Sequence, residues 1–382
     1  MTVIGTDRLR ELVAGLVRIP SPTGDERALA EHIAAELGGR VQPLGERQAN
    51  AVARLRGDGT GPDLMLYAPI DTMTAVDERD LPPEGPEPAP EIEGDLVTGP
   101  GAGNPKGHAA CVMAAFETIR DSGVRLKGDV IAAFGAGGMP DRGGQGVGCS
   151  FLLEQGYHPD YAVIAKPGWS ASHEEVGLAW FEVTVRGHHT YVGSRHRLPY
   201  DNAIASAAEV VLAIETWAED YTVRHTSGQV APQAIVGAIE GGWWRMPAFT
   251  PAACRFLVDV RLSPRDTPAQ VKREFLTLVH GLGAEAEMVL SIPGTSTDPG
   301  SPVVRAAVGA FERLDGHHVP QEGMSGATDA NILRSRGVPT VRVGMPKVAG
   351  ITDFALGMNT VDVREMARLT ELLVMIASEV AG

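Results

Sequence analysis

Apolar residues follow two different rhythms in the first 170 positions of the chain. They recur every three or four residues in 6–18 and from Leu29 to Leu37, which predicts two amphipathic helices. Thr23 and Glu26, just before the second helix, have the spacing of a capping box. Short apolar runs predict buried strands, and a longer stretch predicts another helix. These strands fall at 52–55, 64–68, 130–134 and 162–165, and the helix falls at 107–119.

The pattern changes near residue 177, where strands of alternating polar and apolar residues begin. Strands are expected at 178–185, 234–239, 255–262 and 287–292, and helices at 203–217 and 268–282. This β-α-β-β-α-β order is that of the ferredoxin-like motif. Helices at 303–314, 331–335 and 363–380 and a strand at 340–343 then return to the first pattern. We therefore predict a larger mixed-sheet α/β domain (1–176 plus 293–382), interrupted by a smaller ferredoxin-like α+β domain (177–292).

Two segments show neither pattern. Residues 81–95 are rich in Pro and Glu, so we expect a solvated loop there. Residues 135–148 are rich in glycine but lack the residue spacing of a nucleotide-binding P-loop. A phosphate site is therefore not expected in the glycine-rich segment.

Composition narrows the class of protein. With 33 Lys and Arg against 48 Asp and Glu, the formal net charge is −15, which disfavours nucleic acid and anionic membranes as partners because both attract cationic surfaces. The three cysteines are far apart in the sequence, as expected for buried thiols in a reducing compartment. We recognise no secretory leader and no apolar run as long as a bilayer span. These features predict a cytoplasmic protein whose partner is a small molecule.

Five stretches stand out in order along the chain: IPSPTGDE, LMLYAPIDTM, TGPGAGNPKGHAA, RFLVDVRLSP and SGATDANILRSRGVPTVRVG. Together they resemble landmarks of the M20 family of metallopeptidases, which includes deacetylases, desuccinylases and carboxypeptidases. The resemblance implies a zinc-peptidase-like larger domain and a small domain through which two chains pair. It also implies hydrolysis of an amide next to a carboxylate by two zinc ions that share a water molecule.

Most positions at which the resemblance implies metal ligands carry residues that do not bind zinc. Counted along the motifs, these positions fall on Pro69, Asn104, Gly138 with Met139, Lys166 and Ala355. Two dications stripped of water need several imidazole or carboxylate ligands. We therefore expect no metal site and no other cofactor.

Four residues are candidate catalytic groups. Asp71, which in the family orients a metal-binding His, is either a structural cap or a reassigned catalytic group. Lys106 is retained from the family motif, with a surface lysine at a helix start as the alternative. Lys166 provides a fixed cation where the family has a carboxylate, with a solvent-facing lysine as the alternative. Tyr191 falls where the family has a His that crosses the dimer to stabilise an oxyanion, and a phenol can donate the same hydrogen bond.

Three further residues are candidate contacts for a substrate. The resemblance implies that Arg261 holds the substrate's carboxylate, although an ion pair with Asp259 is the alternative. Trp169 is expected at the mouth of the cleft, and Asn104 within it. An aromatic residue at that place suits a flat or apolar ligand.

These observations leave three functions open. The first is an enzyme that acts without metal ions on a small carboxylate-bearing, amide-like or amino-acid-derived substrate. The second is a catalytically inactive relative that binds a metabolite or a partner protein. The third is an amide hydrolase with relocated metal ligands, for example Asp71, Asp141, His108 and Asp353. In each case we expect a homodimer formed through the small domain.

Overall fold

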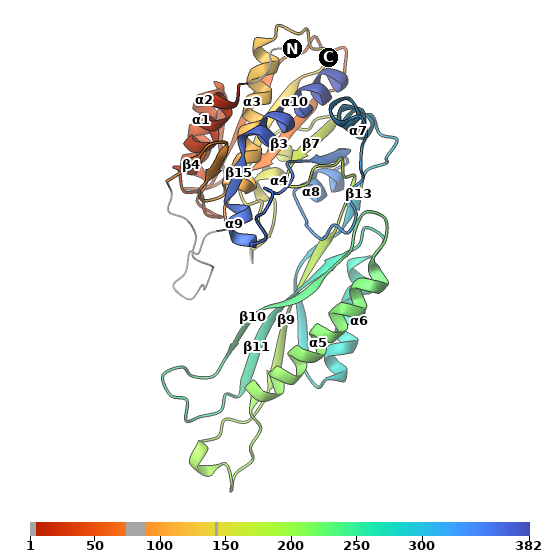
Figure 1. The fold of residues 1–382 in the computed structure, drawn as a ribbon. Coiled ribbons are helices and arrows are strands. Elements are labelled where there is room, and N and C mark those ends of the chain that lie inside the picture. Colours follow the sequence, from red (N-terminus) through yellow and green to blue (C-terminus); the bar gives the residue numbers. More distant parts are fainter. Residues whose placement is uncertain (1–4, 74–88, 142–143) are drawn as a thin grey trace. The chain divides into compact units, whose positions relative to one another are not determined.

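The computed structural model describes residues 5–73, 89–141 and 144–382, which divide into two units (Figure 1). Unit 1 comprises residues 1–173, 297–321 and 328–382, and unit 2 comprises residues 174–296 and 322–327. The sequence pattern gave no sign that the short segment 322–327 joins unit 2. It does so because Met324 packs with Val176 and Val230 and donates its backbone N–H to Gln229.

Unit 1 is built on a six-stranded mixed sheet. Its strands, in spatial order, are β1 (Arg40–Pro43), β2 (Ala49–Leu55), β6 (Val130–Gly135), β3 (Leu64–Pro69), β7 (Tyr161–Ala165) and β14 (Thr340–Val343). The last four run parallel to one another, whereas β2 is antiparallel to β6, and β1 is antiparallel to β2. The mixed α/β class predicted from the sequence is therefore confirmed.

Helices cover both faces of this sheet (Figure 1). The larger hydrophobic cluster joins one face of the sheet to α1 (Thr6–Val17), α2 (Arg27–Leu37), α3 (Gly107–Asp121), α7 (Pro302–Asp315) and α10 (Val363–Val380). A smaller cluster joins the other face to α4 (Val147–Glu154) and α8 (Ala330–Ser335). Residues of β3 alternate between the clusters, because successive strand residues point to opposite faces. Leu64, Leu66 and Ala68 belong to the larger cluster, and Met65 and Tyr67 to the smaller.

Several short elements of unit 1 were not predicted. A three-stranded sheet forms from β4 (Glu91–Glu93), β5 (Leu96–Thr98) and β15 (Thr360–Asp362), and a short helix, α9 (Phe354–Met358), precedes β15. The loop expected at 81–95 is wrong for residues 91–93, and residues 81–88 lie outside the described part of the chain. Elements this short span too few residues to establish a periodic pattern.

Unit 2 has its own hydrophobic core and its own four-stranded sheet. Its elements are β9 (Gly177–Arg186), α5 (Ala203–His225), β10 (Ala234–Gly241), β11 (Ala253–Leu262), α6 (Pro268–Gly281) and β12 (Glu285–Ile292). The sheet order is β10-β11-β9-β12, with each pair antiparallel. This order of elements is the expected β-α-β-β-α-β. Helix α5 continues past the predicted end at Trp217, because Ala218 and Tyr221 extend its buried face.

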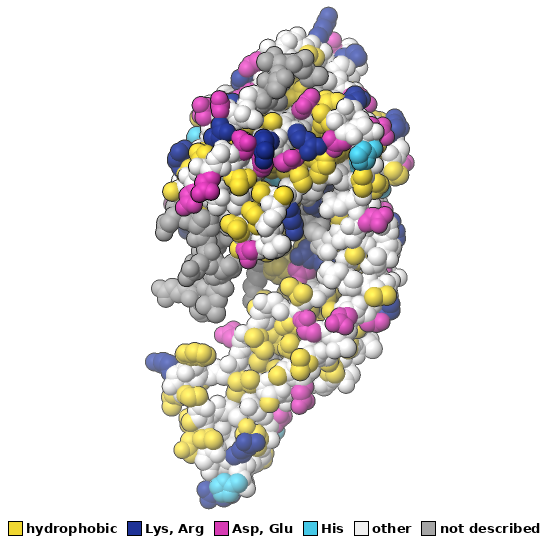
Figure 2. All heavy atoms as spheres, viewed as in Figure 1, with side chains coloured by type: hydrophobic (Ala, Val, Ile, Leu, Met, Phe, Trp, Pro, Cys, Tyr) yellow, Lys and Arg dark blue, Asp and Glu magenta, His cyan; other side chains and the backbone are white. Residues whose placement is uncertain are grey.

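Two properties of the whole chain bear on its partners. In the described ranges no helix is both long and apolar enough to cross a bilayer. Acidic and basic side chains are interspersed on the face of unit 1 seen in Figure 2.

The three cysteines are buried and reduced, and each belongs to a different hydrophobic cluster. Cys111 lies in the larger cluster of unit 1, Cys149 in the smaller one and Cys254 in the core of unit 2.

Candidate functional site

Four of the positions at which the family resemblance implies metal ligands form two contacting pairs in unit 1. Lys166 directly follows β7, and its Nζ lies 3.2 Å from Oδ1 of Asn104 in the irregular turn η1 (Ala102–Lys106). Pro69 ends β3 beside Gly138, where an added Cβ would lie 2.5 Å from that of Pro69. The fold therefore gathers these positions, and they present an ammonium, an amide, a proline ring and a glycine.

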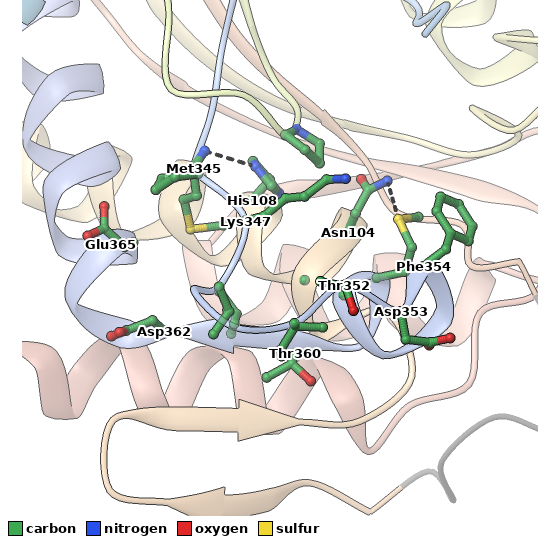
Figure 3. A pocket seen from close by; sticks show the side chains of 18 residues that line it. Asn104, His108, Met345, Lys347, Thr352, Asp353, Phe354, Thr360, Asp362 and Glu365 are labelled. Atoms are coloured by element: carbon green, nitrogen blue, oxygen red, sulfur yellow. Dashed lines mark hydrogen bonds between the residues drawn. The ribbon is translucent and has the colours of Figure 1, made fainter.

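A pocket of about 620 Å³, including open solvent at its mouth, lies beside Asn104 (Figure 3). Its apolar lining comes mainly from Met345, Pro346, Val348, Ile351, Phe354 and Met358. Asn104 and His108, from η1 and the first turn of α3, add polar groups to the wall. We call the part of the pocket at these two residues its buried end. The pocket is therefore suited to a small, largely apolar ligand with one polar end.

Lys166 is only 6% exposed, so the alternative of a solvent-facing lysine is wrong. Its ammonium can only donate hydrogen bonds, so the Asn104 amide must turn its oxygen toward Nζ. The Asn104 NH₂ group then faces Met358, with 3.6 Å between Nδ2 and the sulfur. A thioether is a weak acceptor. The amide is therefore held in one orientation, and its NH₂ group has only a weak acceptor.

His108 is 1% exposed and lines the same pocket. Its Nε2 lies 3.3 Å from the backbone N of Met345, which donates to it. Burial, followed by the nearby positive charges of Lys166 and Arg342, lowers the pKa of His108 to about 3. The imidazole is therefore neutral at physiological pH, and it carries its proton on Nδ1.

Asp71 is fully buried, and its carboxylate accepts three hydrogen bonds. The backbone N–H groups of Gly138 and Met139 donate to it at 2.9 and 2.8 Å, and the Thr23 hydroxyl donates at 2.8 Å. Of the two readings offered by the sequence, this geometry matches the structural cap. Asp71 fixes the backbone at the positions where the resemblance places a Glu-Glu pair.

Glu26 was predicted to be part of a capping box with Thr23, and this prediction is wrong. The Thr23 hydroxyl bonds Asp71 instead, while Oε1 of Glu26 accepts from the backbone N–H groups of Gly24 and Gly137 at 2.9 and 3.0 Å. Oε2 of Glu26 has no hydrogen-bond partner among the described residues. Burial is the main reason why the pKa of Glu26 rises to about 6. The residue that the sequence pattern indicates as part of a helix cap is therefore a buried acid beside Asp71.

Lys106 is fully buried, so the alternative of a surface lysine is wrong. Its Nζ donates to the backbone oxygen of Ile19 at 2.7 Å, and no carboxylate in the described part of the chain pairs with it. Burial alone lowers the pKa of Lys106 to about 8. The structure gives no hydrogen bond between Lys106 and Asp71 or Lys166.

A second buried contact was missed by the sequence analysis. The hydroxyl of Tyr67 donates to Oδ2 of Asp329 at 2.5 Å, and both side chains are buried. Burial and the nearby Asp329 carboxylate raise the pKa of Tyr67. The two residues lie within quoted motifs, LMLYAPIDTM and SGATDANILRSRGVPTVRVG, but no spacing rule brings them together.

Trp169 was expected at the mouth of the cleft, and its side chain packs within unit 1. Its Nε1 donates to Asp315 at 2.6 Å, its ring meets Phe311 edge-on, and the Arg368 guanidinium lies 4.3 Å from the ring centroid. It is not among the residues that line the pocket in Figure 3. These contacts explain the position of the Trp169 side chain without a bound ligand.

The two candidates from unit 2 have different surroundings. Tyr191 is 50% exposed, and its ring rests against Phe249 with 5.4 Å between centroids. Arg261 forms a two-pronged ion pair with Asp259, with distances of 2.8 and 3.0 Å. The alternative partner suggested by the sequence is therefore the one that Arg261 has. Its planar fork is already occupied by a carboxylate.

The sequence of this chain matches the model of peptidase family M20/M25/M40 over residues 65–378. The chain belongs to this family. The N-formyl-4-amino-5-aminomethyl-2-methylpyrimidine deformylase of Bacillus subtilis is 23% identical over 331 residues, which cover 77% of this chain and 75% of that protein.

Solved structures show the same fold as this M20/M25/M40 member. Human carnosine dipeptidase 1 matches with a TM-score of 0.75 and 16% identity, over 98% of this chain and 96% of that one. The Bacillus subtilis YXEP protein, a dinuclear metal binding peptidase, matches with a TM-score of 0.66 and 16% identity, over 98% and 97% of the two chains.

In the residues that the structure describes, no three His, Cys, Asp or Glu side chains gather as a metal site. Of the relocated set considered from the sequence, Asp71 accepts backbone N–H groups, as does Asp353, which caps α9 by accepting from Leu356. His108 accepts from Met345. The described side chains therefore do not assemble that set of ligands.

Proposed function

We propose that this M20 family member acts without metal ions on a small carboxylate-bearing, amide-like or amino-acid-derived compound bound in the unit 1 pocket. The observation that carries the proposal is the hydrogen bond between Lys166 and Asn104. It places a cation and an amide, hydrogen-bonded to each other, at two positions where metal-ligand side chains are expected. A fixed ammonium offers a ligand positive charge in the region where the family resemblance implies zinc.

Lys166 is the proposed catalytic group. In the hydrolysis of an amide, water adds to the carbonyl carbon, the C–N bond breaks, and the departing nitrogen takes a proton. Negative charge develops on the carbonyl oxygen during this reaction, and a buried cation stabilises it more strongly than water does. Asp71 and Lys106 are proposed to act through position, because each is committed to groups of the backbone.

Tyr191 and a homodimer complete the proposal. Strand β10 is an edge of the unit 2 sheet, and it exposes Ile235 and Ile239 at 56% and 57%. An exposed apolar edge strand favours pairing with another chain. We propose that two copies pair along β10 and that Tyr191 supplies its phenol to the partner's site. The three buried thiols suit the cytoplasm, which we keep as the proposed location.

The second candidate function is a binding protein without turnover. It is favoured by the commitment of Asp71 to three hydrogen bonds and by the burial of Lys106. Neither side chain is then available as a general base. In that case Lys166 holds a ligand but does not take part in a reaction.

The test combines metal analysis with kinetics on the full-length protein. N-formyl and N-acyl amino acids are supplied as substrates with and without a chelator, and bound metal is measured. We expect turnover that the chelator does not change, and Lys166→Met should lower kcat at least about 100-fold, since removal of one electrostatic stabiliser has that effect. Lys127→Met, which removes an exposed lysine of unit 1 outside the pocket lining, should change kcat little.

Two other outcomes would contradict the proposed metal-free catalysis. About two tightly bound zinc ions per chain with chelator-sensitive turnover would overturn the metal-free proposal. Ligand binding that depends on Lys166, with no turnover of any compound, would favour the binding protein.

A further inference from the structure

The buried end of the pocket has two N–H donors that lack good acceptors. The first is the NH₂ group of Asn104, which the bond from Lys166 turns toward the sulfur of Met358. The Asn104 side chain is half-buried, and an amide NH₂ that faces a thioether forgoes most of the energy of a hydrogen bond to oxygen. A ligand oxygen at this place would recover that energy.

The second donor is Nδ1 of His108. Because Nε2 accepts the Met345 N–H, the proton of the neutral ring must be on Nδ1. The Gly103 backbone faces the ring and slightly favours its protonated form, but Nδ1 has no hydrogen bond of normal geometry with any described residue. A buried donor without an acceptor costs about 1–3 kcal/mol, so an oxygen that completes it is bound favourably.

Two cationic side chains, Lys166 and Arg342, lie near this end of the pocket. Lys166 and Arg342 both act on His108 electrostatically, in the direction expected of nearby cations. The carboxylates that line the pocket have partners of their own: Asp362 pairs with Arg364, Glu365 pairs with Arg368, and Asp353 caps α9. Two donors beside a cation suit an anionic oxygen better than a neutral one.

The remaining walls restrict the rest of the ligand. Their apolar part is formed by Met, Pro, Val, Ile and Phe side chains, which favour a compact apolar body. In addition, the guanidinium that the family resemblance assigns to a carboxylate, Arg261, is occupied by Asp259. The carboxylate of a substrate therefore needs a different cation in this chain.

We propose that Asn104 and His108, with Lys166 behind them, bind the carboxylate of a small apolar acid at the buried end of the unit 1 pocket. This inference rests on the proposed function and adds to it the site and the class of the anionic group. The ligand body lies against Met345, Ile351, Phe354 and Met358, and its carboxylate accepts from the Asn104 NH₂ group and from Nδ1 of His108.

Binding of phenylacetate and of its neutral counterpart phenylacetamide to the full-length protein tests the site. We expect calorimetry to show phenylacetate binding at least about tenfold more tightly, a difference of about 1.4 kcal/mol. Asn104→Asp keeps the size of the side chain but adds a negative charge, and it should abolish this preference. Lys127→Met, at an exposed lysine of unit 1 outside the pocket lining, should retain it.

A second measurement does not depend on a variant that must fold. In crystals grown with 4-bromophenylacetate, the anomalous signal of bromine should lie among the apolar walls, with carboxylate oxygens about 2.7–3.2 Å from Asn104 Nδ2 and His108 Nδ1. Equal affinity for acid and amide, an unchanged preference in a folded Asn104→Asp protein, or bromine outside this pocket would overturn the proposal.

The two proposals fail separately. Acid binding at the buried end without any turnover would overturn the catalytic proposal and leave the carboxylate site. Metal-free turnover that depends on Lys166, with no preference for acids over amides, would overturn the carboxylate site and leave the catalytic proposal.

Discussion

Among the ionisable side chains buried in unit 1, Glu26 and Lys106 have no opposite charge beside them in the described part of the chain and have shifted pKa values. Glu26 accepts two backbone N–H groups, and Lys106 donates to one backbone oxygen. Burial disfavours the charged form of each, so the pKa of the acid rises and that of the base falls. Their effects on stability therefore have opposite dependences on pH.

Glu26→Gln should remove a dependence of stability on pH. The pKa of Glu26 is raised from 4.5 to about 6, so the folded state holds a proton that the unfolded state loses between these values. Stability of the native protein should fall by about 2 kcal/mol as pH rises through this window, and stay lower above it. Urea titrations at pH 4.5 and 7 measure the change, with Glu31→Gln as an exposed control on the same helix. If stability changed equally between the two pH values in the wild type, Glu26→Gln and Glu31→Gln, the burial of Glu26 would be contradicted.

Lys106→Met should make the protein more stable at neutral pH. The pKa of Lys106 is lowered from 10.5 to about 8, so its charge destabilises the fold fully below pH 8, and this cost is relieved as pH rises toward 10.5. Removing the charge, less one lost hydrogen bond, should add about 2 kcal/mol at pH 7 and little at pH 10.5. Lys127→Met, on the surface, is the control for chemical denaturation. A loss of stability at pH 7 would show that the bond to Ile19 outweighs the buried charge.

Individual residues were predictable from the sequence only where a motif fixes their place. The positions of Asn104 and Lys166 were found in this way, and the structure brings them together. The burial of Lys106 and the three bonds of Asp71 were not predictable, because they depend on loops that fold over these side chains. Glu26 was misread because a capping box and a buried acid share the same local sequence.

At the scale of elements, the packing between β3 and β6 depends on one missing side chain. Gly135, the last residue of β6, lies against Tyr67 of β3, and a Cβ there would be 1.8 Å from the tyrosine hydroxyl. Tyr67 needs this space to reach Asp329. The end of β6 therefore has to leave room for the Tyr67 side chain in its buried contact with Asp329.

Gly135→Ala should destabilise unit 1 by about 3 kcal/mol, because the added methyl group meets a buried ring that cannot move freely. Gly309→Ala, within helix α7, is the matched control. An added Cβ there meets only the end of Arg313 at 3.5 Å, so a gain of about 0.5–1 kcal/mol is expected from helix propensity. Thermal melts compare the two variants. Similar melting temperatures would show that Tyr67 does not occupy this space.

Longer elements were predictable because several turns or strand repeats carry the same apolar period. Helix α10 begins and ends at the predicted residues, Val363 and Val380, and β14 at Thr340 and Val343. The three-residue strands β4, β5 and β15 carry no such period. They form because backbone groups pair between segments far apart in the chain, from Glu91 to Asp362.

At the scale of the molecule, each unit has a hydrophobic core of its own. The change of period near residue 177 is the sequence signal from which we expect two domains. The recruitment of 322–327 to unit 2 was not predictable, since it depends on the contacts of Met324. Association of whole chains is a further property that the pattern alone leaves as an expectation.

Ile239→Lys should convert the proposed dimer to a monomer. Ile239 lies on the edge strand β10 and is 57% exposed, so a lysine there is tolerated in a monomer and opposes pairing of strand edges. Sedimentation measures the mass. Ile92→Lys, at a residue of unit 1 that is 46% exposed, should leave the dimer intact. A wild-type chain that sediments as a monomer would contradict the dimer.

The distribution of the thiols, one in each hydrophobic cluster, gives this protein three internal reporters of local opening. Burial raises the pKa of Cys111 to about 12 and that of the other two thiols as well, so a closed protein should react slowly with an alkylating reagent. Mass spectrometry of peptides labelled at increasing urea concentrations would time the exposure of each thiol. If unit 2 opens as a separate cooperative block, Cys254 should become alkylated at a different urea concentration from Cys111.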